Sequence, residues 1–167
     1  MDDCDWTTRI PTPGTIIKAD GLTIQCHAQA GATLISGDLD RAIAALAPGA
    51  QILGLLGTLP KPPYALRIAR DRALLCTNAP LPVEGWQSGY AVSAAEDLFL
   101  EITIRGPRAS EVAAACLTSQ TASPSAAVLF AGFGALVTRI QNGLSIRVPP
   151  PESAALWAHL HRLTQVL

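Results

Sequence analysis

The histidines and cysteines of this sequence are the side chains best suited to bind a metal or to act as nucleophiles. His159 and His161 resemble a metal-binding pair, but residues two apart on a helix lie about 200° apart around its axis. Cys26 and His27 are neighbours in a predicted strand, where successive side chains point to opposite faces. We therefore expect solvated histidines on the helix and no shared Cys–His site.

The carboxylates closest to one another also have a structural explanation. Asp38 and Asp40 stand at the start of a predicted helix, where negative charge interacts favourably with the helix dipole. Glu96 and Asp97 precede a predicted strand and are typical of a charged turn. These pairs are consequently predicted to be structural, with acid–base catalysis as the less favoured interpretation.

Nucleotide and nucleic-acid motifs are not evident. The segment Gly132-Phe133-Gly134 lacks the third glycine of a dinucleotide fingerprint, and a strand rather than a helix follows it. Trp6, Trp86 and Trp157 are expected to be packing residues rather than base-stacking platforms, because a net charge of −1 offers no basic groove. Binding to nucleic acid is therefore excluded.

The four cysteines are far apart in the sequence, at positions 4, 26, 76 and 116, and form no C-x-x-C pair. Cys26, Cys76 and Cys116 lie in apolar patterns, where a free thiol behaves as a small hydrophobic group. This usage is typical of a reducing compartment, so we expect a cytoplasmic protein.

No membrane segment or leader is expected. The acidic start Met1–Asp5 is followed by no apolar run. The uncharged stretch 42–60 is interrupted by Pro48-Gly49, which favours a helix ending at Ala47 followed by a buried segment over a membrane span. Charged residues make up only 15% of the chain, against about 25% in typical domains, so either part of the surface is buried against a partner or the core is rich in small residues.

The best-determined element is the segment 98–117. Leu98, Leu100, Ile102 and Ile104 alternate with other residues at the period of a half-buried strand. Gly106-Pro107 ends this strand, and Pro107 suits the first position of a short amphipathic helix. Strand, corner and helix are thus all predicted.

The remaining pattern predicts hairpins packed by a few helices. Asp20-Gly21 and Asn142-Gly143 are hairpin signals. Ser145 and Arg147 are expected to face outward, and the final helix to bury Leu156, Leu160, Leu163 and Leu167. Strands are predicted at 15–18, 22–28, 64–69, 73–77, 89–93, 98–105, 126–131, 135–140 and 144–148. The class is α+β, with mostly antiparallel sheet and three to four packed helices in one domain, 1–167, that has a soft boundary near 60–64 or 88–90.

Several segments resemble a known family. They are Leu53-Gly54-Leu55, Leu59-Pro60, 65–76, 91–95, 102–117, Leu144 to Pro149 and 154–160. Together they resemble the gamma subunit of heterotetrameric sarcosine oxidase and the small subunit of N-methylglutamate dehydrogenase, within the aminomethyltransferase-like, folate-binding fold group. The first fifty residues match least, and Ala94 stands where the family often has an acidic residue.

The resemblance implies a non-catalytic accessory subunit of a flavin-dependent secondary-amine oxidase or dehydrogenase complex linked to one-carbon (folate) metabolism. In such complexes flavin, dinucleotide and folate are held by partner subunits, so this chain is expected to have no catalytic, cofactor or metal site. Aromatic and arginine side chains commonly anchor subunit contacts. Trp86, Arg105, Arg108 and Phe133 are the candidate partner contacts.

Two alternatives stay open. A stand-alone folate-binding or aminomethyltransferase-like protein would need a pocket with a carboxylate facing the pteridine, and Glu84, Glu96 and Asp97 are the candidates. A small interaction module could instead form a homodimer through an exposed sheet edge.

Overall fold

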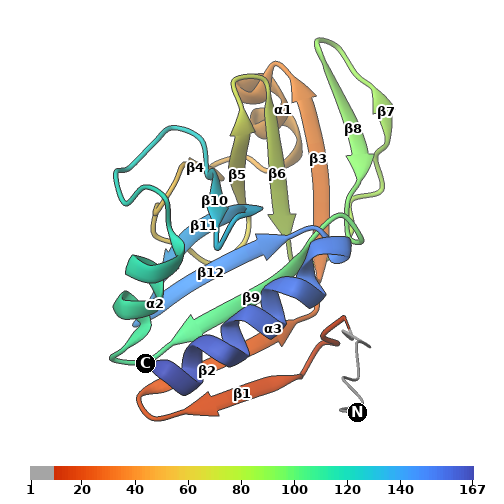
Figure 1. Ribbon diagram of the computed structural model, residues 1–167. Coiled ribbons are helices and arrows are strands. Elements are labelled where there is room, and N and C mark those ends of the chain that lie inside the picture. Colours follow the sequence, from red (N-terminus) through yellow and green to blue (C-terminus); the bar gives the residue numbers. More distant parts are fainter. Residues whose placement is uncertain (1–9) are drawn as a thin grey trace.

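The computed structural model describes residues 10–167, which form two six-stranded β-sheets and three helices (Figure 1). Cys4, Trp6 and the acidic segment Met1–Asp5 lie outside the described residues. The predicted α+β class with mostly antiparallel sheet is confirmed.

Sheet A contains only antiparallel pairs, in the order β1-β2-β9-β12-β11-β10. Its strands are β1 (Ile16–Ala19), β2 (Leu22–His27), β9 (Leu100–Arg105), β10 (Ala127–Phe130), β11 (Phe133–Ile140) and β12 (Gly143–Val148). The hairpins predicted at Asp20-Gly21 and Asn142-Gly143 join β1 to β2 and β11 to β12. Both turns contain a residue with positive φ, Gly21 at 69° and Asn142 at 58°, as such tight connections require.

Sheet B has the order β4-β5-β6-β3-β8-β7. Its strands are β3 (Gly31–Gly37), β4 (Gln51–Leu53), β5 (Tyr64–Ala69), β6 (Arg72–Thr77), β7 (Gly85–Trp86) and β8 (Tyr90–Ala94). The pair β4–β5 is parallel and the other pairs are antiparallel. The chain leaves sheet A at the end of β2 and enters sheet B in β3 after only three residues.

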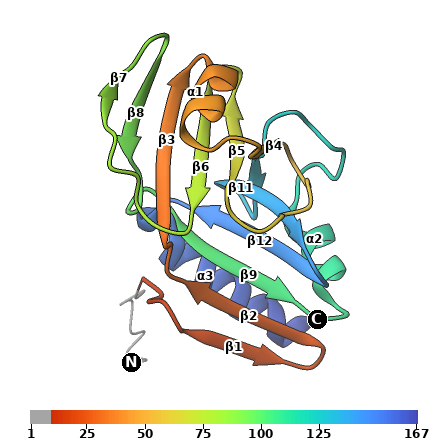
Figure 2. The ribbon, with the colours of Figure 1, turned by 180° about the vertical axis from the view of Figure 1, so that it is seen from behind.

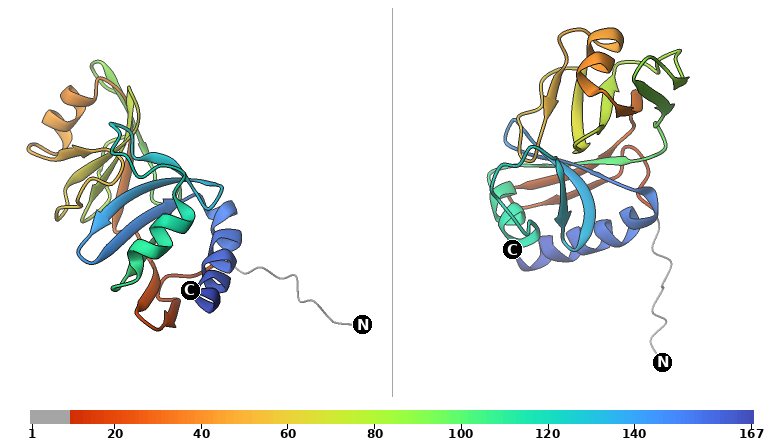
Figure 3. Two further views of the ribbon diagram at one scale, coloured as in Figure 1. Left: turned by 60° about the vertical axis from the view of Figure 1, so that its left-hand side comes forward. Right: turned by 90° about the horizontal axis from the view of Figure 1, so that it is seen from above.

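The helices cover the outer faces of the two sheets. Helices α2 (Ala109–Cys116) and α3 (Pro150–Val166) lie on sheet A, and α1 (Leu39–Leu46) lies on sheet B (Figures 2 and 3). A third hydrophobic cluster joins the sheets, with Leu136 of β11 packed among residues that include Leu66 of β5 and Leu74 of β6. Each sheet is therefore covered on both faces near the junction.

Strand β3 was not predicted, and its burial explains why. Ala32 faces the cluster between the sheets, whereas Ile35 packs with α1 in the cluster on the opposite face. Thr33 is also buried. A strand covered on both faces does not show the alternation of apolar and polar residues by which strands are recognised.

The expectation that Ser145 and Arg147 face outward is wrong. Ser145 is fully buried and Arg147 is only 3% exposed. Both residues lie on the face of β12 opposite Leu144 and Ile146, as the alternation requires, but that face is covered by sheet B rather than by water. The polar residues of β12 thus lie inside the protein.

The helix ends follow the predicted signals with small differences. Asp38 caps α1 and accepts a hydrogen bond from the Arg41 amide at 3.0 Å. Helix α2 begins at Ala109 with Arg108 as its N-cap, so Pro107 occupies the preceding turn and not the first helical position. In α3, Leu156 and Leu160 are buried as expected, Leu163 is half-buried, and Leu167 is 36% exposed, so it does not belong to the buried stripe.

Candidate functional site

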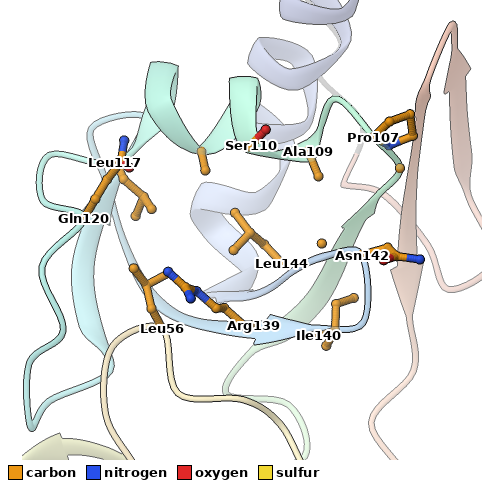
Figure 4. Close-up of a pocket in the computed structure, with 13 residues that line it drawn as sticks. Leu56, Pro107, Ala109, Ser110, Leu117, Gln120, Arg139, Ile140, Asn142 and Leu144 are labelled. Atoms are coloured by element: carbon orange, nitrogen blue, oxygen red, sulfur yellow. The ribbon is translucent and has the colours of Figure 1, made fainter.

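A groove with a volume of about 660 Å³ lies between α2 and the β11–β12 hairpin. Figure 4 shows Ala109 and Ser110 of α2 on one side of it and Arg139 and Ile140 of β11 on the other. The remaining lining residues are Leu56, Gly106, Pro107, Ala113, Leu117, Gln120, Asn142, Gly143 and Leu144. Most of these are apolar or small, and Arg139 is the one ionisable side chain among the described residues of the lining. The groove is suited to accept apolar groups rather than to perform acid–base chemistry.

Two glycines at one end of the groove permit a close approach of main chains. Gly106 has φ of +125° and lies against the carbonyl of Gly21, where a Cβ atom would clash. A Cβ atom on Gly143 would clash even more closely with the carbonyl oxygen of Ile104. Any other residue would separate these segments. The groove therefore depends on backbone packing at the β9–α2 corner.

A network of polar side chains occupies the interface between the two sheets. Arg147 Nη2 donates a hydrogen bond to the Tyr64 hydroxyl at 2.7 Å and lies 3.2 Å from Glu101 Oε1. The guanidinium is also 5.7 Å from the centroid of the Tyr64 ring, within the range of a cation–π interaction. Ser145 Oγ donates to the same Glu101 oxygen at 2.6 Å. The network thus connects β9 and β12 of sheet A with β5 of sheet B.

Burial changes the ionisation of the groups in this network. It raises the pKa of Tyr64 to about 12, although the positive charge of Arg147 acts in the opposite direction. The pKa of the Cys76 thiol is also raised by burial. For Arg147, burial acts to lower the pKa, but Cys76, Glu101 and Tyr64 more than compensate, and the pKa lies above its ordinary value. At neutral pH the network therefore contains a protonated tyrosine and a charged guanidinium. Both groups retain their protons, so neither can act as a general base.

The four candidate partner contacts do not form one surface. Trp86, in β7 at the edge of sheet B, is 74% exposed. Arg105 and Arg108 lie at the β9–α2 corner, at the far end of the molecule from β7 (Figure 1). Phe133, at the start of β11, is half-buried against the core of sheet A.

The two arginines at the corner already have partners within the chain. Arg108 forms an ion pair with Glu111 at 2.8 Å and also donates to the main-chain oxygen of Leu167. The hydrogen-bonded ion pair with Glu111 raises the pKa of Arg108 and lowers that of Glu111. Arg105 Nη1 donates to the carbonyl of Gln141 at 3.3 Å. Both side chains are therefore held in place at the surface.

The expectation that Cys26 and His27 point to opposite faces is confirmed, whereas the expectation of solvated helix histidines holds for His161 and is wrong for His159. Cys26 and His27 lie on opposite faces of β2: the Cys26 thiol is buried beside the carbonyl of Pro11, whereas His27 Nε2 lies 2.7 Å from Thr103 Oγ1. His161 is exposed, but His159 is half-buried, 4.0 Å from the Cys116 thiol. Burial raises the pKa of Cys116 to about 11, so this thiol is protonated and unreactive at neutral pH.

The carboxylates Asp40, Glu96 and Asp97 occupy the predicted helix start and turn. Glu96 and Asp97 form a turn between β8 and β9, and Asp40 is in the first turn of α1. Glu84 is exposed in the loop before β7. None of these carboxylates lines the groove. Within residues 10–167, no three histidine, cysteine or acidic side chains are grouped so that they could hold a metal ion.

Sequence reasoning missed the residues of the buried network, Tyr64, Glu101, Ser145 and Arg147. A signal was available for two of them, because Glu101 and Arg147 are oppositely charged residues inside predicted strands. These two residues are direct neighbours in the β9–β12 register. In a chain with so few charges, that pairing indicates a buried ion pair. The packing of β5 against them could not be read from the sequence.

The helices of residues 10–167 include none with the length and hydrophobicity needed to cross a membrane.

Comparison with known proteins gives a structural similarity only. Neither a protein-family model nor a curated protein matches the sequence. The fold is similar to a chain of the solved structure described as the heterotetrameric sarcosine oxidase from Corynebacterium sp. U-96 in complex with pyrrole 2-carboxylate. The two chains have a TM-score of 0.60 and 15% sequence identity over 90% of this chain and 85% of that chain. At this level of identity the similarity concerns the fold.

Proposed function

We propose that this chain is a subunit of a complex of the heterotetrameric sarcosine oxidase type. The observation that supports the proposal is the similarity of fold over nearly the whole length of both chains. The resemblance of the segments around 53–60, 102–117 and 144–160 to the gamma subunit of such complexes points in the same direction. Within the complex the chain is an accessory subunit, and the partner subunits hold the flavin, the dinucleotide and the folate.

The character of the groove and of the buried polar network is consistent with an accessory role. The groove beside α2 is lined mainly by apolar and small residues, and the network between the sheets contains side chains that are protonated or paired at neutral pH. The alternative of a stand-alone folate-binding protein needs a carboxylate in a pocket that can admit a pteridine. The described lining of the 660 Å³ groove contains no carboxylate, so this alternative gains no support from it.

Purification from the native host tests the proposal directly. The chain is tagged at its chromosomal locus and isolated under mild conditions. We expect a flavin-containing subunit to copurify in a fixed ratio, with the absorbance of bound flavin and with oxidation of a secondary amine such as sarcosine by the preparation. A chain that elutes at its own mass, without flavin and without amine oxidation, would refute the proposal.

A further inference from the structure

A second, smaller pocket lies where the two sheets meet, and we call it the junction pocket. Its volume is about 160 Å³. Gln29, from the connection between β2 and β3, forms part of its wall, together with Tyr64 of β5 and Thr77 of β6. Glu101 and Arg147 complete the wall from sheet A. The pocket is therefore built from both sheets and from the segment that joins them.

The wall contains polar atoms that the protein leaves unpaired. Arg147 is 97% buried, yet its Nε and Nη1 atoms have no hydrogen-bond partner within residues 10–167. The same is true of both amide atoms of Gln29, Oε1 and Nε2. Buried polar groups in native proteins are paired with few exceptions, and an unpaired charged donor is especially unfavourable. Both side chains line the junction pocket, but these atoms have almost no accessible surface, so a small rotation of the two side chains would bring them to an occupant of the pocket as the partner that they lack.

The unpaired atoms define the chemistry of that occupant. Guanidinium and amide nitrogens carry several donor hydrogens, whereas the acceptor atom left unpaired is the single oxygen Gln29 Oε1. An occupant rich in acceptors is needed, and a carboxylate matches a guanidinium best. Glu101 also lies in the wall and would repel a bare anion. A donor group on the occupant, such as a hydroxyl or an ammonium, would interact with Glu101 and with Gln29 Oε1.

The volume sets the size of the occupant. A water molecule takes up about 30 Å³ in the liquid, so the junction pocket has room for at least about five non-hydrogen atoms. We propose that the junction pocket binds a small carboxylate that also carries one hydrogen-bond donor, of the size of glycolate or glycine. This proposal is independent of the proposed function, because it depends only on the residues of this chain.

Calorimetric titration of the purified full-length chain tests the proposal with four probes. Glycolate and glycine carry both groups, acetate lacks the donor, and ethanolamine lacks the carboxylate. We expect glycolate or glycine to bind and to raise the melting temperature. Acetate should bind about tenfold more weakly, and ethanolamine should not bind. We expect a dissociation constant of about 1 mM or lower. Absence of binding by both glycolate and glycine up to about 10 mM would therefore overturn the proposal. Acetate as tight as glycolate, or binding of ethanolamine, would overturn it too.

Two variants locate the binding. Gln29→Leu removes the unpaired amide and leaves the Arg147–Glu101 pair intact, so it should fold and bind about 10- to 100-fold more weakly. Gln120→Leu makes the same change at an exposed position of the 660 Å³ groove and should bind as the natural chain does. Arg147→Met, measured where it folds, should abolish binding. Equal affinity in Gln29→Leu and the natural chain would place the ligand elsewhere and refute the assignment.

Discussion

The groove beside α2 and the junction pocket contain very different side chains. The groove, at about 660 Å³, is roughly four times larger, but its described lining holds one ionisable residue, Arg139. The junction pocket holds a buried arginine, a carboxylate and a tyrosine whose pKa is raised to about 12. A hollow lined by small residues and glycines lowers the stability of the fold little. A buried charge, by contrast, must be paired with an opposite charge or with hydrogen bonds. Size alone is therefore a poor guide to a specific site.

The largest effect on stability is expected when the buried ion pair is broken. Glu101→Leu leaves the guanidinium of Arg147 buried without its carboxylate, and we expect a loss of about 3–5 kcal/mol in the free energy of unfolding. Urea denaturation followed by circular dichroism measures this loss.

The double variant Glu101→Leu/Arg147→Met is the control for that experiment. Removing both charges leaves neither one unpaired, so most of the lost stability should return. If Glu101→Leu alone loses less than about 1 kcal/mol, the charges of the junction pocket are solvated. The groove and the junction pocket would then not differ in how strongly charge affects stability.

A smaller loss is expected at the floor of the groove. Leu144 is 5% exposed, and Leu144→Ala removes apolar contacts with the core of sheet A, at a cost of about 2–3 kcal/mol. The value lies toward the low end for a buried leucine because the cavity would open into the groove. Leu129→Ala, at a position that is 51% exposed, should change stability by less than about 1 kcal/mol. Equal losses in the two variants would contradict this interpretation.

Tyr64→Phe should have an intermediate effect that depends on pH. Loss of its hydrogen bond with Arg147 is expected to reduce stability by about 1.5 kcal/mol at neutral pH. The pKa of Tyr64 is about 12 in the folded chain, against an ordinary value of 10.0. The unfolded chain therefore releases this proton first, and the contribution of the hydroxyl is complete below about pH 10 and lost as the pH rises toward 12.

Tyrosinate absorbance provides the measurement. The difference between the natural chain and Tyr64→Phe should show one group titrating near 12, and Tyr90→Phe serves as the matched control. A midpoint near 10 for Tyr64 would mean that water reaches the junction pocket freely.

The smallest effect on stability is expected at Trp86, which belongs to neither hollow. Its side chain is 74% exposed, so Trp86→Ala should alter the free energy of unfolding by no more than about 0.5 kcal/mol. If Trp86 anchors a partner subunit, the same change should weaken assembly by about 2 kcal/mol. Trp157→Ala, which removes a half-buried residue of the core cluster, should show the reverse order. Equal losses of melting temperature and of complex formation in Trp86→Ala would contradict the assignment.

Local signals predicted much of the fold. The Asp-Gly and Asn-Gly turns and the strand around Ile102 and Ile104 depend on interactions between close neighbours in the sequence. Strand β3 was not predicted because both of its faces are buried. Strands β4 and β7 were not predicted because they have only three and two residues, too few for a period to be recognised.

The candidate site was less predictable, for a reason that Arg147 illustrates. The alternation in β12 correctly placed Arg147 on the face opposite Ile146. Which of the two faces meets water depends on sheet B, whose strands come from earlier and separate parts of the chain. Sequence reasoning therefore found the orientation of the side chain but not its environment. The partner contacts at Trp86, Arg105, Arg108 and Phe133 stay predictions.

The pairing of β2 with β9 has a consequence for biosynthesis. Thr23 is the register neighbour of Arg105, so the β1–β2 hairpin cannot complete its sheet until the ribosome has released the chain as far as Arg105. At about 5–20 residues per second, β2 waits for several seconds with an unpaired edge and an apolar face. During this interval nascent chains can associate with one another. Slow translation between residues 28 and 100 would prolong this interval, and a chaperone bound at the ribosome would shield the exposed edge during it.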